Sequence, residues 1–346
     1  MREMWRKIVV LFLVSVVISG IFTTYFEEYQ KSLLMPIRNI IVLGTWDNRS
    51  EEDVPITYYG HAKGINPVHV ALSVRRTVLK ILEEQHHYPF ADTDGFRKIL
   101  DIADYFIGNA EEHYYEGLKF YVWTYNFDWP TYNLSAPWVS GMAQGHVIEV
   151  MLAAHKLTGE EEYLEAARFA ANAMAVPLEH GGVAVEVDGG LWFEEYAKAG
   201  VNPPYVLNGH NFALEGLWYL SLVDDKYREL FEKGVKALRH LLPRFDARIW
   251  SMYDLVGTPA NRKYQQIHVN QLQMLYNRTN NEIFDIYAKK FQMQLYLPFT
   301  LLFRMWIYPS TFLISIFFIN TLGTFLAVTV ILFEVQKIRR RNDHVR

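Results

Sequence analysis

Two uncharged apolar runs lie near the ends of this 346-residue sequence. They are IVVLFLVSVVISGIFTTYF at residues 8–26 and FLISIFFINTLGTFLAVTVILF at residues 312–333. Each is close to the roughly 20 apolar residues that a helix needs to cross a bilayer. The first could also be a cleaved signal peptide, but its apolar run is long and no A-x-A site follows it. We therefore expect two transmembrane helices.

Charges beside these runs predict how the chain is oriented. Arg2, Arg6 and Lys7 precede the first run, and QKIRRR at residues 336–341 follows the second. Basic flanks favour the cytoplasmic side, so both termini are expected there and the chain between the runs is expected to be extracellular or lumenal. The predicted divisions are a terminus with its anchor at 1–39, an extracytoplasmic domain at 40–296, and an interfacial segment, second span and basic tail at 297–346.

The composition excludes several classes of function. Lys and Arg together number 34 against 38 Asp and Glu, so no basic surface indicates a nucleic-acid partner. The chain has no cysteine, which excludes disulfides, thiolate chemistry and Cys-bound metals. No tight cluster of His, Asp and Glu indicates a metal site, and we expect no metal and no organic cofactor.

The segment between the apolar runs is predicted to be mainly α-helical. Residues 160–174, for example, place Tyr163, Ala167, Ala170 and Met174 on one helical stripe. Helical pairs are expected at 66–85 with 93–114, 140–157 with 160–176, 208–222 with 225–243, and 265–277 with 280–296. Aromatic, β-prone stretches separate them at 118–129, 181–196 and 247–255. This pattern predicts an incomplete or closed α/α toroid of about four helical hairpins, with short β-hairpins between the pairs.

The first helix of each predicted pair opens with an amide and a histidine. These residues are Asn66 and His69, Gln144 and His146, Asn208 and His210, and His268 and Asn270. If these helices form the inner ring of a toroid, their amino ends gather at one rim, where N–H groups and the helix dipoles favour an anionic ligand. Each residue taken alone could equally cap a helix or bond to buried backbone.

A pair of adjacent acids lies among aromatic residues in GLWFEEYAKAG, residues 190–200. Apolar surroundings raise the pKa of a carboxyl group, which prepares it for proton transfer near neutral pH. On a strand, neighbouring side chains point to opposite faces. If Glu195 faces a site, we expect Glu194 to face solvent or a neighbouring helix.

The same residues carry a resemblance to a known family. The motifs M-A-Q-G at 142–145, W-x-E-E-Y at 192–196, V-L-N-G at 206–209, Y-D-L at 253–255 and H-x-N-Q-L-Q at 268–273 occur in this order. Together they resemble the carboxy-terminal domain of D-glucuronyl C5-epimerases, which convert glucuronate to iduronate in heparan-type chains. The resemblance covers about half of the chain and implies a membrane-anchored uronate C5-epimerase whose partner is a polysaccharide or glycan.

The resemblance also implies which residues form the site. Positions that line the active site in the family correspond here to Glu195, Tyr196, Tyr253 and Tyr264. The family's Y-D-L motif continues with an arginine expected to engage substrate, but this chain has Val256. Either Arg262 or Lys263 could replace that cation.

Epimerisation at C5 removes a proton next to a carboxylate and returns one to the opposite face. Glu195 and Tyr264 are a reasonable acid–base pair, with Tyr196 and Tyr253 as partners or alternates. Substrate contacts are expected from the rim residues Gln144, His146, Asn208, His210, His268 and Asn270, from Arg262, and from the flat faces of Trp138 and Trp192.

Other functions stay open at this stage. A polysaccharide lyase begins with the same proton removal, and a glycoside hydrolase on the same toroid would need a second acid, for which Asp254 and Asp128 are candidates. A non-catalytic glycan-binding membrane protein is a third alternative, for which Val256 is the best support.

Overall fold

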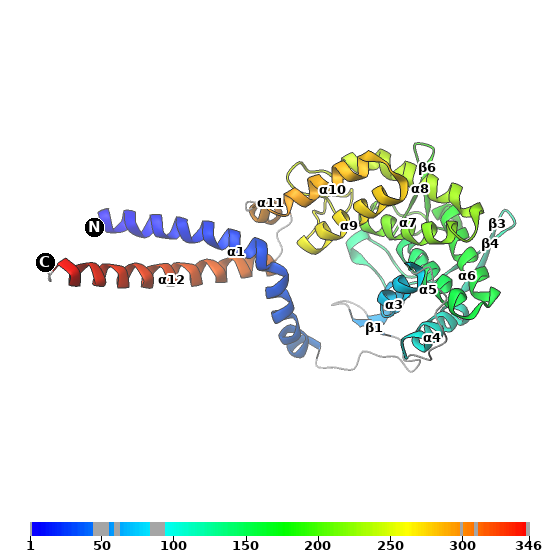
Figure 1. Ribbon diagram of the computed structural model, residues 1–346, viewed down its shortest axis with the longest axis horizontal. Coiled ribbons are helices and arrows are strands. Elements are labelled where there is room, and N and C mark those ends of the chain that lie inside the picture. Colours follow the sequence, from blue (N-terminus) through cyan, green and yellow to red (C-terminus); the bar gives the residue numbers. More distant parts are fainter. Residues whose placement is uncertain are drawn as a thin grey trace.

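Two long apolar helices run side by side, away from a larger helical body (Figure 1). The computed structural model describes residues 2–43, 55–58, 63–83, 94–297, 300–307 and 311–343. Helix α1 covers Arg2–Leu43 and helix α12 covers Thr311–Asp343, and the two chain ends lie at the same end of the pair. Their segments Trp5–Glu27 and Thr311–Ile338 are long and apolar enough to cross a membrane, which agrees with the predicted runs.

Polar side chains join the two apolar helices along their contact. Ser19 Oγ and Thr321 Oγ1 are 3.0 Å apart and both side chains are buried. Asn320 donates a hydrogen bond of 2.8 Å to Thr23 Oγ1. Hydroxyl and amide groups between apolar helices pair with one another because the apolar surroundings offer them no other partner.

The body between the apolar helices is mainly helical, and its helices form the four predicted pairs. Their bounds are α2 Pro67–Leu72 and α3 Arg75–Glu83 with α4 Asp94–Gly108, α5 Gly141–Thr158 with α6 Glu161–Asn172, α7 Leu207–Ser221 with α8 Arg228–Leu241, and α9 Arg262–Thr279 with α10 Glu282–Gln294. Helix α11, Thr300–Ile307, leads to the second apolar helix. Short 3-10 turns cover Pro130–Tyr132, Ala173–Ala175, Leu178–His180, Asp225–Tyr227 and Leu242–Phe245.

The described parts of the chain contain three antiparallel β-hairpins in addition to the helices. They pair β1 Ile56–Tyr58 with β2 Lys63–Ile65, β3 Glu111–Tyr115 with β4 Leu118–Val122, and β5 Ala184–Val187 with β6 Gly190–Phe193. The third hairpin falls in the predicted stretch 181–196, and β4 begins the stretch 118–129, but β3 forms where the predicted helix 93–114 was expected to continue, because α4 ends at Gly108. The third β-prone stretch, 247–255, forms only isolated bridges, Asp246 with Ser251 and Met252 with Pro259, because the chain turns sharply at Asp254.

Helices α5 and α7 pack so closely that their backbones touch. A Cβ atom on Gly145 would lie 2.4 Å from the carbonyl oxygen of Phe212, and one on Gly216 would lie 2.4 Å from that of Gly145. Glycine is required at such crossings because any side chain would separate the helices. The contact holds the amino ends of both helices near each other.

Buried charges tie the same helices to α3. Arg75 donates to Glu149 of α5 at 3.2 Å and to Glu215 of α7 at 2.6 Å. Both carboxylates are buried, and Glu149 also lies 3.1 Å from the ring nitrogen Nδ1 of His146. Because an unpaired buried charge is very costly, this network favours one arrangement of the helices.

Substituting Gly145 by alanine should destabilise the fold. The added Cβ has no room against the α7 backbone, and overpacking of this kind costs roughly 1–3 kcal/mol. We expect a lower midpoint of thermal unfolding for the full chain in detergent. Gly108→Ala, where a Cβ would meet nothing within 4 Å, is the matched control and should leave the midpoint unchanged or slightly raised. Equal midpoints for the two variants would contradict the close packing.

Candidate active site

A cavity of about 1160 Å³ opens where several helices of the body begin. Ser140 and Asn261, which cap the amino ends of α5 and α9, line it, as does Asn208 in the first turn of α7. Asn66, the cap of the short helix α2, lines it too. The amino ends of these first helices therefore do meet at one cavity, where their backbone dipoles favour negative charge.

The two adjacent acids have opposite environments. Glu194 is fully buried, and its carboxylate accepts hydrogen bonds from the backbone N–H groups of Glu195 at 2.8 Å, Tyr196 at 3.2 Å and Tyr205 at 2.9 Å. The expectation that Glu194 faces solvent or a neighbouring helix is therefore wrong. The strand ends at Phe193, so strand alternation no longer applies, and the carboxylate instead orders the loop.

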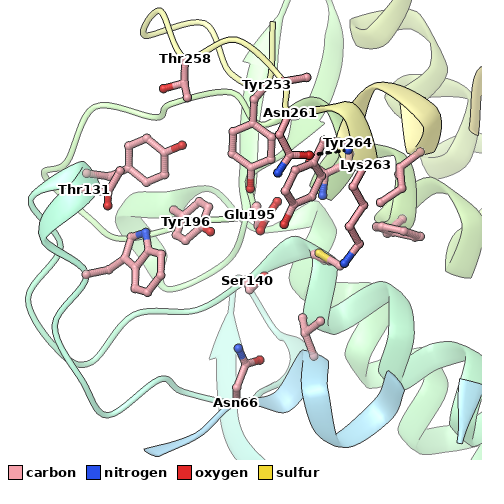
Figure 2. Close-up of a pocket in the computed structure, with 18 of the residues that line it drawn as sticks. Asn66, Thr131, Ser140, Glu195, Tyr196, Tyr253, Thr258, Asn261, Lys263 and Tyr264 are labelled. Atoms are coloured by element: carbon pink, nitrogen blue, oxygen red, sulfur yellow. Dashed lines mark hydrogen bonds between the residues drawn. The ribbon is translucent and has the colours of Figure 1, made fainter. Parts of the chain in front are cut away.

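Glu195 points into the cavity instead (Figure 2). Its oxygen Oε2 is buried and has no hydrogen-bond partner within the described part of the chain. Burial, with the nearby charge of Glu194 as the second cause, raises the pKa of Glu195 to about 8, whereas the Tyr196 hydroxyl lowers it. Burial also raises the pKa of Glu194 to about 7, against the effect of its N–H donors. Of the two acids, Glu195 is the one whose unpartnered oxygen lies at the cavity.

Phenol groups surround the Glu195 carboxylate. Figure 2 shows Tyr196, Tyr253 and Tyr264 around it, and the last two rings have centroids 4.8 Å apart. Tyr132 joins this group, with its ring 4.7 Å from that of Tyr196. Burial, and after it the charge of Glu195, raises the pKa of Tyr196 and of Tyr253 well above the usual value. Tyr196 and Tyr253 therefore stay protonated at neutral pH and can donate hydrogen bonds.

Only part of the predicted substrate-binding set lies at the cavity. Trp138 and Asn208 line it, and the buried oxygen Oδ1 of Asn208 has no partner among the described residues. Trp192 lies in the core instead, stacked on His210 at 4.0 Å. Gln144 donates to the carbonyl groups of Tyr121 and Ala170, and so holds β4 and α6. Exposed Asn270 accepts a hydrogen bond from Gln266 away from the cavity lining.

Three of the four predicted rim histidines, His146, His210 and His268, are packing residues outside the cavity lining, whereas His69 lines the cavity. His210 Nδ1 accepts from the backbone N–H of Phe193 at 2.9 Å, so its other nitrogen donates to the Gly234 carbonyl. His268 lies 2.9 Å from the hydroxyl of Ser251, and His146 pairs with Glu149. Burial lowers the pKa of His210 and His268 to about 3, which keeps both neutral. These three histidines lie at least one turn inside their helices, and at that depth their side chains point between helices and not into the cavity.

The cation at the cavity is Lys263, not Arg262. The Arg262 guanidinium donates to the Leu295 carbonyl at 2.8 Å and lies 5.5 Å from the ring centre of Tyr25, outside the lining. Lys263 lines the cavity together with Val256, the residue that replaces the family arginine. Arg75 and Arg304, the lining arginines of the described chain, are both ion-paired.

Several lining residues were not singled out from the sequence. These are Tyr125, Thr131, Tyr132, Ser140, Thr258 and Asn261. For Ser140 and Asn261 a signal existed, because serine and asparagine are favoured at the caps of helices. Tyr132 follows the aromatic stretch 118–129, but nothing in the sequence distinguishes it from a packing tyrosine. Among the described residues, no group of three His, Asp or Glu side chains could hold a metal ion.

The motifs and the geometry agree with a comparison to known families. Residues 116–293 match the sequence model of the D-glucuronyl C5-epimerase C-terminus. The chain belongs to this family. The D-glucuronyl C5-epimerase C-terminal match contains Glu195, Tyr196, Tyr253 and Tyr264, so all of the predicted catalytic residues lie inside it.

Two relatives are similar to the chain in sequence. It is 33% identical to the D-glucuronyl C5-epimerase of Caenorhabditis elegans over 167 residues, which are 42% of this chain and 27% of that enzyme. It is 34% identical to the uncharacterized protein MJ1128 of Methanocaldococcus jannaschii over 260 residues, 69% of this chain and 82% of that protein. The chain thus spans about a quarter of the nematode enzyme but most of the archaeal protein.

Replacing each of the adjacent acids by glutamine should change stability by different amounts. Glu195 has a pKa of about 8 when folded and an ordinary value of 4.5, so the unfolded chain loses this proton first and stability falls as pH rises between these values. Glu195→Gln removes this loss, and its unfolding midpoint should exceed that of the wild type by an increasing margin up to pH 8, worth about a few kcal/mol.

Glu194→Gln is the matched comparison. Its amide NH₂ would face backbone N–H donors, and an unsatisfied buried donor costs about 1–3 kcal/mol. The pKa of Glu194 is also raised, to about 7, so the substitution removes a smaller loss of stability, and the cost of the unsatisfied donor offsets this gain. The midpoint of Glu194→Gln should therefore lie below that of Glu195→Gln at pH 8. Thermal scans of the full chain from pH 5 to pH 9 measure both effects, and equal midpoints for the two variants would contradict the assigned environments.

Proposed function

We propose that this protein is a membrane-anchored uronate C5-epimerase that acts on a polysaccharide or glycan. The single observation that carries this proposal is Glu195, a buried carboxyl group with a raised pKa and an unpartnered oxygen, facing a cavity surrounded by phenols. Membership of the C5-epimerase family supports the same chemistry.

The proposed reaction uses Glu195 and Tyr264 on opposite faces of the sugar ring. The Glu195 carboxylate takes the proton from C5, and the electrons of the C5–H bond move into the adjacent carboxylate of the sugar. The Tyr264 hydroxyl then gives a proton to C5 from the other face, which inverts the centre. Exchange of protons with solvent returns Glu195 and Tyr264 to their starting states. Tyr196 and Tyr253 hydrogen-bond to these groups and hold them in place.

The negative charge that develops on the sugar carboxylate needs stabilisation. Lys263 lines the cavity at the position where its ammonium can take the role of the family arginine that Val256 replaces. The amino ends of α5, α7 and α9 and the amide of Asn208 add dipoles directed at the same space. Fixed groups of this kind act where charge appears in the transition state. Trp138 and Trp129 supply apolar lining for the ring.

A hydrolase is disfavoured by the state of the candidate second acids. Asp254 is buried, accepts the Tyr132 hydroxyl at 2.7 Å and three backbone N–H groups, and so has no free oxygen for catalysis. Asp128 is exposed and outside the lining. In the described part of the cavity the carboxylates are Glu195 and Glu27, and the latter is paired with Arg304.

The proposal includes the arrangement of the chain. The apolar helices anchor the protein with both termini in the cytoplasm, and residues 40–296 form the catalytic domain on the outer or lumenal side. The body is proposed to be an incomplete α/α toroid with α5, α7 and α9 inside, which is supported by their amino ends at one cavity.

The catalytic pair can be tested by hydrogen exchange. We expect the full chain in detergent to exchange the C5 hydrogen of a glucuronate-containing glycan with deuterated water, detected by NMR. Glu195→Gln and Tyr264→Phe should each lower the exchange rate by at least about 10²-fold, the usual contribution of a general acid or base. Tyr276→Phe, on the same helix but outside the cavity lining, is the control and should keep full activity.

Results of that assay separate the alternatives. An increase in absorbance from an unsaturated uronate product would identify a lyase instead. Glycan binding without exchange, unaffected by the Glu195 and Tyr264 substitutions, would identify a non-catalytic binding protein.

The charge stabilisation proposed for Lys263 can be tested by substitution. Removing one donor that stabilises transition-state charge typically costs about 10²–10³ in rate, so Lys263→Gln should reduce exchange by about 10²-fold, with Lys263→Arg restoring part of it. The exposed Lys233→Gln, whose lysine pairs with Glu229 on α8, serves as the control. An unchanged rate in Lys263→Gln would assign the charge stabilisation to the helix ends alone.

A further inference from the structure

The cavity that holds Glu195 also extends to the apolar helices. Its lining includes Glu27, the last residue of the apolar segment in α1. It also includes Phe312 and Leu313, the second and third residues of the apolar segment in α12. One continuous cavity thus connects the acid and the phenols to the level at which both membrane-crossing segments end.

A buried ion pair fixes this junction. Arg304 of α11 donates two hydrogen bonds to the Glu27 carboxylate, at 2.7 and 2.9 Å, and both side chains are at most 7% exposed. The Arg304 guanidinium also lies 5.3 Å from the ring centre of Trp250 in the core of the body. A bidentate pair of this kind is strong and directional, so the body is held against the apolar helices and not merely tethered to them.

Other contacts hold the same junction. The Tyr25 hydroxyl of α1 donates to the Tyr296 carbonyl at 3.0 Å, and the Arg262 guanidinium lies over the Tyr25 ring. Arg262 belongs to α9, the helix that carries Tyr264 and Lys263. The helix that presents the proposed catalytic tyrosine therefore contacts the end of an apolar helix through this cation–π interaction.

Part of the lining does not suit a free uronate polymer. Such a polymer is charged and polar along its whole length, yet Phe312 and Leu313 join Leu72 and Ile267 in lining this cavity. Apolar side chains at the membrane end of a sugar site are suited to the first carbons of a lipid chain, whose burial is favourable. The polar groups around Glu195, shown in Figure 2, are suited to the sugar.

We propose that the substrate is a uronate glycan that is still attached to its lipid carrier in the membrane. This inference rests on the proposed function and adds the state of the substrate. The lipid stays in the bilayer beside Phe312, and the attached glycan enters the cavity from the membrane side to reach Glu195. The epimerisation then precedes whatever transfer reaction removes the glycan from its lipid.

Two synthetic substrates test this proposal. Both contain the same short glucuronate-containing oligosaccharide with a phosphodiester at the reducing end, which carries either a phytanyl chain or a methyl group. C5 hydrogen exchange is measured by NMR with the full chain in nanodiscs. We expect kcat/KM for the phytanyl substrate to exceed that for the methyl substrate by at least about tenfold, since the bilayer concentrates the former beside the cavity.

A pair of phenylalanine variants separates recognition from simple concentration in the bilayer. Phe312→Ala removes a ring from the cavity and should bring the phytanyl preference down by about fivefold to tenfold. Phe318→Ala removes a ring from the same helix that is 63% exposed and outside the lining, and should leave the preference unchanged.

The possible outcomes are distinct. Exchange on both substrates at equal kcat/KM would overturn the lipid-linked substrate and leave the epimerase function standing. A phytanyl preference that Phe312→Ala and Phe318→Ala leave equally unchanged would also overturn it, since the cavity would then not contact the lipid. Exchange on neither substrate would overturn the epimerase function and this inference with it.

Discussion

The site depends on glycines that let one loop lie against the starts of two helices. The backbone N–H of Gly141 donates to the Glu194 carbonyl at 2.7 Å, and a Cβ on Gly209 would lie 2.2 Å from the Glu195 carboxylate. Further along the same helices, Gly145 and Gly216 allow backbone contact. Because these glycines have no side chains, the Glu195 carboxylate can reach the point where the amino ends of the helices meet. The glycines of the M-A-Q-G and V-L-N-G motifs thus have a steric role.

The adjacent acids show how one loop can stabilise itself and still present a reactive group. Glu194 has several backbone donors, which offset the cost of burying it and fix the loop after β6. Its negative charge then opposes ionisation of Glu195, whose own oxygen Oε2 has no partner among the described residues. A raised pKa at Glu195 therefore follows from a stabilised neighbour, and not from burial alone.

Much of the fold was predictable from periodicity, and the site only from motifs. Apolar stripes predicted the helical pairs, and the family motifs predicted Glu195 and the tyrosines that surround it. The environments of His210 and His268 were not predictable, because a histidine one turn inside a helix can point to a cavity or between helices with the same spacing. The burial of Glu194 was not predicted because the strand ends at Phe193, before both acids, so strand alternation does not set their directions. Such choices depend on long-range contacts.

The turn held by Asp254 explains why Val256 can replace the arginine that follows the Y-D-L motif in the family. Asp254 accepts the N–H groups of Val256, Gly257 and Thr258, so the turn keeps its shape without depending on the side chain at position 256. Lys263 in the lining belongs instead to α9, the helix whose Arg262 guanidinium lies 5.5 Å from the ring centre of Tyr25 in the first apolar helix. Under the proposed function, the charge that recognises the sugar carboxylate then lies on a helix in contact with the first apolar helix. A substrate held by Lys263 would be positioned by that helix, which an arginine on a loop could not provide.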